Sequence, residues 1–271
     1  MSKLRDKFWI WGHPAGSHDN TGWGLDGLHS RMTPCECAWY LGIPNVIMVC
    51  YNDNPKPPFE QEALALDCLR ETIWSLVGNS RSNPNADSLG NLEEVLKIAG
   101  THPNITGTMF DDFFSHGRDQ VYTPEILKTI RSRLQNAPGG PLDMWVVVYD
   151  YVLDHPMQQH LEHFDGVTYW TWVGKDLSLF DANFAKLKEV AKGKRIMLGC
   201  YLYDYGKAKK TGVKQELTVE DMRFQLERYA QTVRDGEAEG IILLSNTVAD
   251  LGFEAVEYTK QWLQEHGDEP V

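Results

Sequence analysis

The chain has 271 residues, with 26 Lys and Arg against 38 Asp and Glu, which gives a formal net charge of −12. Hydrophobic residues make up 42% and charged residues 24%, as in ordinary globular proteins, so a fibrous or disordered chain is excluded. The acidic excess, without any run rich in Lys or Arg, repels a phosphate backbone, and nucleic acid is therefore not an expected partner.

The sequence predicts a cytoplasmic protein that does not associate with membranes. The first apolar stretch, before His13, has five residues, too few for a signal-peptide core or a membrane helix. No later segment approaches the roughly 20 apolar residues of a membrane span. The five cysteines form an odd set without a C-x-x-C pair, so we expect small core residues rather than disulfides, zinc ligands or nucleophiles.

Eight short apolar runs follow one another along the whole chain, and each predicts a strand. Their ranges are 8–12, 45–51, 71–77, 105–111, 143–149, 166–172, 195–203 and 240–245. The runs are almost continuously apolar, which is typical of parallel strands that are covered on both faces.

Segments with helical periodicity separate these runs. Their ranges are 33–41, 59–69, 92–99, 123–135, 157–163, 180–191, 218–236 and 253–265. Helix starts are marked by Thr33-Pro34, with Glu36 completing a capping box, by Thr123-Pro124 and by Thr218. Division of 271 residues by eight gives about 34 residues per unit, enough for a strand, a crossover helix and two loops.

This rhythm predicts a single domain over residues 1–271, a (β/α)8 TIM barrel. A doubly wound sheet is the structural alternative. The turn after the first run, Gly12-His13-Pro14-Ala15-Gly16, lacks the G-x-G-x-x-G fingerprint that many doubly wound domains carry there.

Four candidate catalytic carboxylates lie at the ends of three of the predicted strands: Asp111 and Asp112 at the end of the fourth, Asp150 after the fifth and Asp204 after the seventh. Catalytic groups of such barrels gather at the carboxyl ends of the strands. Hydrolysis of a glycosidic bond needs one protonated carboxyl group and one ionised carboxylate. A single Asp in such a place is equally well explained as a turn cap, but three strand ends together favour catalysis.

Alternation along a strand prevents Asp111 and Asp112 from both pointing into the barrel. We favour Asp111, the last residue of the apolar run, and expect Asp112 to bond to the loop that follows. One of the two is predicted as nucleophile or base. Asp204 is predicted as the acid, because neighbouring tyrosines provide an apolar setting that favours its protonated form. Asp150 is the reserve candidate for either role.

Trp170 and Trp172, two residues apart, are predicted to form an aromatic wall for a sugar ring, although one of them could instead fill the core. His13 is predicted as a polar donor. The other candidate substrate-binding residues at strand ends are Trp11, Asn52, Tyr149, Tyr203 and Asn246.

We expect no cofactor and no bound metal. A metal site would have to combine His13, His18, Asp19, Asp111, Asp150 and His155, and no local ligand motif supports this set. The capping box accounts for Glu36, and no G-x-S-x-G or P-loop motif occurs.

The fourth run leads into the sequence GTMFDDFF at 107–114, and the seventh ends in Tyr203-Asp204-Tyr205-Gly206. Together with the aromatic sixth run, these segments resemble the TIM-barrel glycoside hydrolase superfamily. The resemblance implies a pair formed by Asp111 or Asp112 with Asp150 or Asp204. Many retaining members of that group have Glu on strands 4 and 7, where this chain has Asp.

The sequence therefore predicts a glycosidase that acts on a small or soluble carbohydrate. One alternative is a metal-dependent sugar isomerase, epimerase or lyase. A Schiff-base lyase is disfavoured because the candidate lysines, Lys175 and Lys207, lie in loops. The other alternative is a carbohydrate-binding barrel without catalytic activity.

Overall fold

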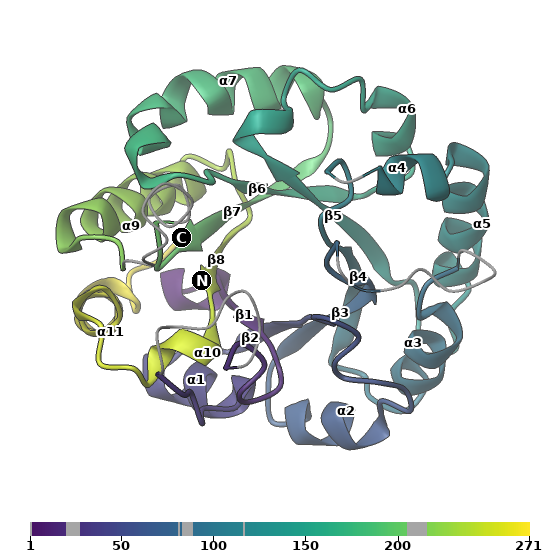
Figure 1. The fold of residues 1–271 in the computed structure, drawn as a ribbon, viewed down its shortest axis with the longest axis horizontal. Coiled ribbons are helices and arrows are strands. Elements are labelled where there is room, and N and C mark those ends of the chain that lie inside the picture. The colour runs from purple at the N-terminus through teal and green to yellow at the C-terminus, as the bar shows by residue number, and fades with distance from the viewer. Residues whose placement is uncertain (1, 20–27, 81, 83–88, 116, 205–215) are drawn as a thin grey trace.

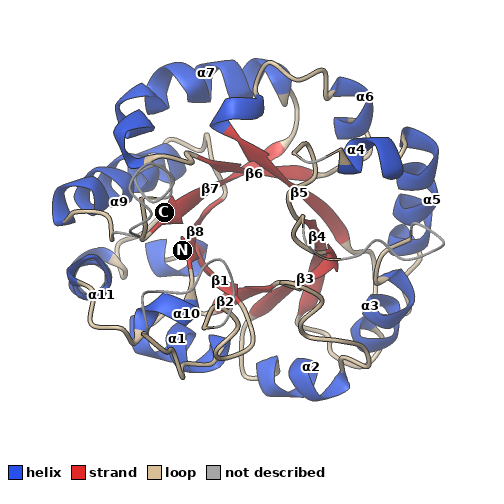
Figure 2. Cartoon of the chain, in the orientation of Figure 1, coloured by secondary structure: helices blue, strands red, loops and turns tan. Residues whose placement is uncertain are grey.

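The computed structural model describes residues 2–19, 28–80, 82, 89–115, 117–204 and 216–271. Eight parallel strands form a closed barrel in chain order, and β1 pairs with β8 (Figures 1 and 2). The strands are β1 (Phe8–Gly12), β2 (Asn45–Met48), β3 (Glu71–Val77), β4 (Ile105–Phe110), β5 (Asp143–Tyr149), β6 (Gly166–Trp170), β7 (Arg195–Tyr201) and β8 (Gly240–Leu244). The predicted (β/α)8 barrel is confirmed, and closure excludes the doubly wound alternative.

Helices surround the barrel (Figure 2). The long connections hold α1 (Pro34–Leu41), α2 (Glu60–Leu66), α3 (Leu92–Ala99), α5 (Pro124–Gln135), α6 (Gln158–Leu161), α7 (Phe180–Val190), α9 (Val219–Arg234) and α11 (Glu254–His266). Short additions are η1 (Leu4–Lys7), α4 (Arg118–Val121), η2 (Asp150–Val152), η3 (Gly174–Leu179) and α10 (Asn246–Ala249). The capping box predicted at Thr33 is present, and Thr218, predicted as a helix start, forms a second capping box with Asp221. Among the described helices, none has the length and apolar character required to cross a membrane.

Five strands end one to three residues earlier than the apolar runs predicted. The backbone turns away from the sheet soon after β2 and β4, where Asn52, Asp53 and Asp112 adopt φ angles of 52°, 58° and 49°. This left-handed conformation is uncommon outside Gly, and Asn and Asp tolerate it best. The residues that follow the shortened strands therefore belong to loops at the barrel rim.

Two tryptophans meet inside the barrel. Trp11 of β1 and Trp170 of β6 have ring centroids 5.2 Å apart, although three strand pairings separate these strands around the barrel. The Trp170 ring lies over Gly199, where a Cβ atom would approach the ring to 2.0 Å. Trp170 is 2% exposed. These rings fill the core beneath the carboxyl ends of the strands.

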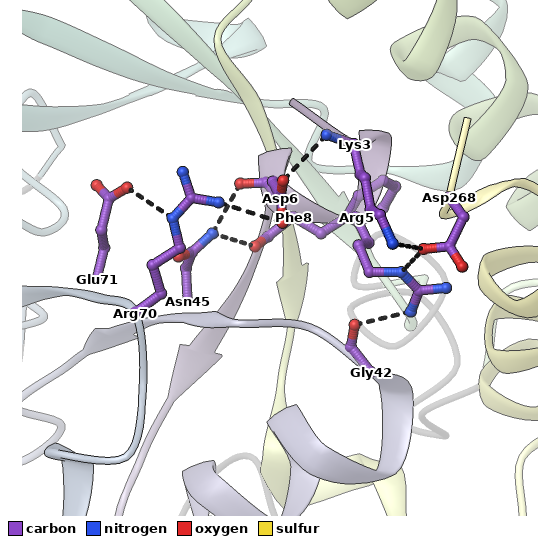
Figure 3. A network of polar contacts seen from close by, with 9 residues as sticks. All are labelled: Lys3, Arg5, Asp6, Phe8, Gly42, Asn45, Arg70, Glu71 and Asp268. Atoms are coloured by element: carbon purple, nitrogen blue, oxygen red, sulfur yellow. Dashed lines mark hydrogen bonds and ion pairs between the residues drawn. The ribbon is translucent and has the colours of Figure 1, made fainter. Parts of the chain in front are cut away.

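Polar contacts close the opposite end of the barrel (Figure 3). Asn45 donates hydrogen bonds to the carbonyl oxygens of Asp6 and Phe8, at 2.9 and 3.0 Å. Arg5 Nε lies 2.7 Å from a carboxylate oxygen of Asp268. The two ends of the chain are thereby joined to the first strands, which makes this end a structural closure.

Three of the five cysteines, Cys37, Cys50 and Cys200, are buried, as predicted for small core residues. That prediction is wrong for Cys68, which is exposed, and incomplete for Cys35, which is partly exposed.

Candidate active site

The carboxylate of Asp112 links three neighbouring strands at the carboxyl end of the barrel. Asp112 follows β4, and one of its oxygens accepts a hydrogen bond of 2.7 Å from the Tyr149 hydroxyl at the end of β5. The other oxygen accepts a hydrogen bond of 2.9 Å from the backbone N–H of Ser80, which follows β3. The side chain of Asp112 is thus bonded to these adjacent elements, whereas its bond to the following loop is made by its carbonyl oxygen, which accepts from the Ser115 hydroxyl at 3.2 Å.

Asp111 lies deeper than Asp112 and is only 6% exposed. Its Oδ1 accepts a hydrogen bond of 2.8 Å from the backbone N–H of Asp112. Burial, and secondarily the neighbouring Asp112 carboxylate, raise the pKa of Asp111 well above its usual range, while Arg118 acts in the opposite direction. Two adjacent carboxyl groups therefore occupy different environments.

Arg118 of α4 fixes the loop that approaches Asp112. Its guanidinium is buried and donates to the carbonyl oxygens of Asn79 and Ser82. The side-chain oxygen of Asn79 accepts hydrogen bonds from the Ser82 hydroxyl and from the backbone N–H of Asn52, at 2.9 and 3.0 Å. This network holds the backbone on both sides of Ser80 and so positions the donor to Asp112.

Aromatic side chains from β5 to β7 lie beside Asp112. Tyr151 stacks on Tyr149 with centroids 5.1 Å apart and an interplanar angle of 7°. The Trp172 ring meets Tyr149 and Tyr201 edge to face, at 5.3 and 5.9 Å. Tyr151 is 54% exposed, so its ring presents an apolar surface to solvent. Burial and the Asp112 carboxylate raise the pKa of Tyr149, whose hydroxyl stays protonated and can donate.

Asp150 belongs to the same group. Its Oδ1 accepts hydrogen bonds from the backbone N–H groups of Tyr151 and Trp172, at 2.9 and 3.3 Å. Partial burial raises the pKa of Asp150. Burial also raises the pKa of Tyr151 to about 12, and Asp112 and Asp150 both add to this increase. The carboxylates after β4 and β5 are thus close enough to act on one tyrosine.

Asp204 is held by a different loop. Its Oδ1 accepts a hydrogen bond of 3.3 Å from the backbone N–H of Gly174, at the start of η3. Tyr203, which precedes Asp204 and was predicted to bind substrate, is buried and packs edge to face on Phe253, at 5.4 Å. The catalytic role of Asp204 and the binding role of Tyr203 stay predictions.

His13 and Asn246 are bonded to each other, which joins the ends of β1 and β8. The Asn246 side-chain oxygen accepts a hydrogen bond of 2.8 Å from the backbone N–H of His13. The side-chain nitrogen donates to the backbone carbonyl oxygens of His13 and Met32, at 2.9 and 2.7 Å. The His13 ring packs against His18 and Tyr51, at 4.8 and 5.4 Å. Burial, and then His18, lower the pKa of His13, which favours a neutral imidazole.

The remaining predicted binding residues differ in how deeply they are buried in the barrel. Trp11 and Trp170 are buried, so the solvent-facing part of the predicted aromatic wall is limited to Trp172. Asn52 lies at the rim, and its side-chain oxygen, like His13 Nδ1, is buried without a hydrogen-bond partner among the described residues.

Sequence reasoning missed several residues of this site. Tyr151 and Tyr201 carry a readable signal, because each is two residues from a tyrosine that was selected, Tyr149 or Tyr203. Arg118 and Ser80 carry none, since their roles depend on backbone contacts between loops.

Metal binding has no support in the described part of the chain, where no group of three or more His, Cys, Asp or Glu side chains is arranged around a common point. His155, one of the six residues weighed as ligands, is paired with Asp119 at 2.8 Å.

No protein-family model matches the chain, and no curated protein is significantly similar to it in sequence. Solved structures do match. The GH99 endo-alpha-mannosidase from Bacteroides thetaiotaomicron has a TM-score of 0.58 and 9% identity over 97% of this chain and 98% of that chain. The active domain 2 of chitinase from Pyrococcus furiosus has a TM-score of 0.57 and 13% identity, over 98% and 97%.

The same fold also occurs in a different kind of protein. The tryptophan synthase alpha-subunit from Pyrococcus furiosus has a TM-score of 0.53 and 11% identity, over 98% of both chains. The neighbours thus include TIM-barrel glycoside hydrolases, the group that the sequence resembles. At these identities the likeness establishes the barrel fold.

Proposed function

We propose that the protein is a glycosidase, a hydrolase of glycosidic bonds, and that its catalytic carboxylates lie after β4 and β5. The observation that carries the proposal is the environment of Asp112. Two neutral donors, the Tyr149 hydroxyl and the Ser80 N–H, hold this carboxylate beside the exposed ring of Tyr151. A carboxylate next to an aromatic surface suits a sugar, whose C–H face packs on the ring while its anomeric carbon meets the carboxylate.

In this proposal Asp112 is the ionised group, which acts as nucleophile or as base toward water. The acid must hold a proton at neutral pH and pass it to the leaving oxygen. Burial raises the pKa of both Asp111 and Asp150, which is the direction that an acid requires. Asp150 is the more accessible to a substrate, and Asp204 is the third candidate.

The substrate is proposed to be a small or soluble carbohydrate. The exposed Tyr151 ring and the partly exposed Trp172 ring provide apolar surface against which the C–H face of a sugar ring can pack. Tyr149 orients Asp112, and Asn246 holds the backbone of His13. Trp11 and Trp170 support the site from below.

A panel of aryl glycosides, assayed with and without a chelator, tests this function. A glycosidase of this kind releases the aryl alcohol from at least one substrate, at a rate that the chelator leaves unchanged. Activity that the chelator abolishes would instead indicate the metal-dependent class. Carbohydrate binding without turnover of any substrate would indicate a binding barrel.

A further inference from the structure

Cys35 and Cys68 are in contact on the outside of the barrel, away from the carboxyl groups described above. Their Sγ atoms are 3.6 Å apart. Cys35 lies in the first turn of α1, and Cys68 lies in the turn between α2 and β3. Both thiols approach the carbonyl oxygen of Ala65, at 2.8 and 3.9 Å. One acceptor at the end of α2 thus brings the two sulfur atoms together.

We propose that Cys35 and Cys68 form a reversible oxidation site, at which a small-molecule disulfide such as oxidised glutathione converts the two thiols into an intramolecular disulfide. The sulfur atoms have to approach by about 1.5 Å to reach the S–S bond length of about 2.05 Å. Cys68 is in a turn outside any helix or strand, so an adjustment of this turn can bring its sulfur closer without disrupting a helix or the sheet.

The reaction proceeds by two thiol–disulfide exchanges. The exposed Cys68 thiolate attacks one sulfur of the small disulfide, which forms a mixed disulfide and releases one thiolate. Cys35 then loses its proton, and its sulfur attacks Cys68 Sγ and displaces the second small thiolate. Two protein thiols are oxidised, one small disulfide is reduced to two thiols, and the protons from the protein pass to these products.

Exposure restricts the reaction to this pair. Cys37, Cys50 and Cys200 are buried, and burial raises the pKa of Cys50 to about 12. Burial also raises the pKa of Cys35, and this effect persists when Cys68 is held in the mixed disulfide. The second exchange should therefore be the slower step, and it should accelerate as the pH rises. It proceeds because Cys68 Sγ already lies against Cys35.

The test uses the full-length protein, reduced, desalted and incubated with oxidised glutathione under native conditions. Free thiols are then alkylated, and the chain is cleaved after glutamate. Cleavage places Cys35 on peptide 1–36 and Cys68 on peptide 63–71, whereas peptide 37–60 holds two of the buried cysteines. The expected product is peptide 1–36 linked to peptide 63–71, identified by mass and abolished by a reductant.

Single variants make the result specific. In Cys35→Ser, Cys68 should accumulate a glutathione adduct, because no second thiol displaces it. In Cys37→Ser, the matched control on the same helix, the linked peptides should form as in the parent protein. A parent protein that accumulates the adduct at Cys68 without linked peptides would overturn the proposal. So would linkage of Cys68 to peptide 37–60.

Discussion

The two ends of the barrel use carboxylates in opposite ways. At the end formed by the starts of the strands, cationic partners neutralise them: Asp268 is bonded to Arg5 and Lys3, and Asp6 lies 3.2 Å from Arg70 (Figure 3). Hydrogen bonds from Arg5 and Lys3 lower the pKa of Asp268. Asp268 is thereby held in the charged form, and these ion pairs join the chain ends to the start of the barrel.

At the carboxyl end, the hydrogen-bond donors to Asp112 and Asp150 are neutral. A tyrosine hydroxyl and backbone N–H groups bond to Asp112 and Asp150, and burial raises the pKa of Asp111. Burial favours the protonated form of a carboxyl group, which a general acid requires, whereas N–H and O–H donors favour the ionised form, which a nucleophile or base requires. We infer that the partners of an acidic residue, more than its position at a strand end, indicate whether its role is structural or catalytic.

The largest expected effect is on turnover. Asp111, Asp112, Asp150 and Asp204 are to be changed singly to Asn, and two of the four variants should lose roughly 10²- to 10⁴-fold in kcat, the usual contribution of acid–base catalysis. Asp112→Asn should be one of the two. Asp268→Asn at the other end of the barrel is the control and should keep parental turnover. Parental kcat in all four variants would contradict the carboxylate mechanism.

Trp170→Ala tests whether the core beneath the site is structural. Because the ring is buried against Trp11 and Tyr201, its loss should reduce the free energy of unfolding by about 3–5 kcal/mol, as measured in urea. Trp172→Ala, two residues along the chain and partly exposed, should cost clearly less and should weaken carbohydrate binding instead. Equal stability of the two variants would show that Trp170 does not fill the core.

Tyr149→Phe removes the hydroxyl donor to Asp112 and little volume. A hydrogen bond to a charged group contributes about 1.5–3 kcal/mol, so kcat should fall roughly 10- to 100-fold if the bond persists in the transition state. Tyr40→Phe is the matched control, because Tyr40 donates a 2.6 Å hydrogen bond to Glu257 on the outer helices. A loss of kcat in both variants, or in neither, would contradict a specific role of the Tyr149 hydroxyl in catalysis.

The fold could be predicted from the sequence because each strand and helix is marked by residues within or next to it. Continuous apolar runs identified the strands, and Thr33 and Thr218 marked helix starts through their own hydroxyl groups. The ends of the strands were harder to predict, because the apolar sequence continues beyond them. β2 ends at Met48 and β6 at Trp170, but the apolar runs extend to Tyr51 and Trp172. Burial in a loop and burial in a strand look alike in a sequence.

Only part of the candidate site could be predicted from the sequence, because contacts between distant segments are not visible in it. Carboxylates at strand ends can be counted in the sequence, but their partners come from elsewhere in the chain. The Ser80 N–H that bonds to Asp112 is placed by Arg118, and the two residues are 38 positions apart. The buried position of Trp170 depends on the absence of a side chain at Gly199, a pairing that requires the strand register.

The last prediction concerns pH and stability. Burial raises the pKa of Asp111 in the folded state, so the folded chain holds its proton more tightly than the unfolded chain does. This contribution to stability is complete below the unfolded pKa of about 3.9 and is lost as the pH rises from there through the folded pKa. Asp111→Asn, which resembles the protonated acid, should match the parent protein in acid and become the more stable of the two toward neutral pH.

Urea unfolding at a series of pH values measures this difference, and the opposite end of the barrel provides the control. The pKa of Asp268 is lowered in the folded state, so its contribution is present above the unfolded pKa and is lost as the pH falls. Asp268→Asn should therefore be the less stable form at neutral pH, by a small amount because this group is exposed. Parallel pH curves for the parent protein and Asp111→Asn would mean that Asp111 ionises as easily in the folded state as in water, and its burial could then no longer supply a protonated acid at neutral pH.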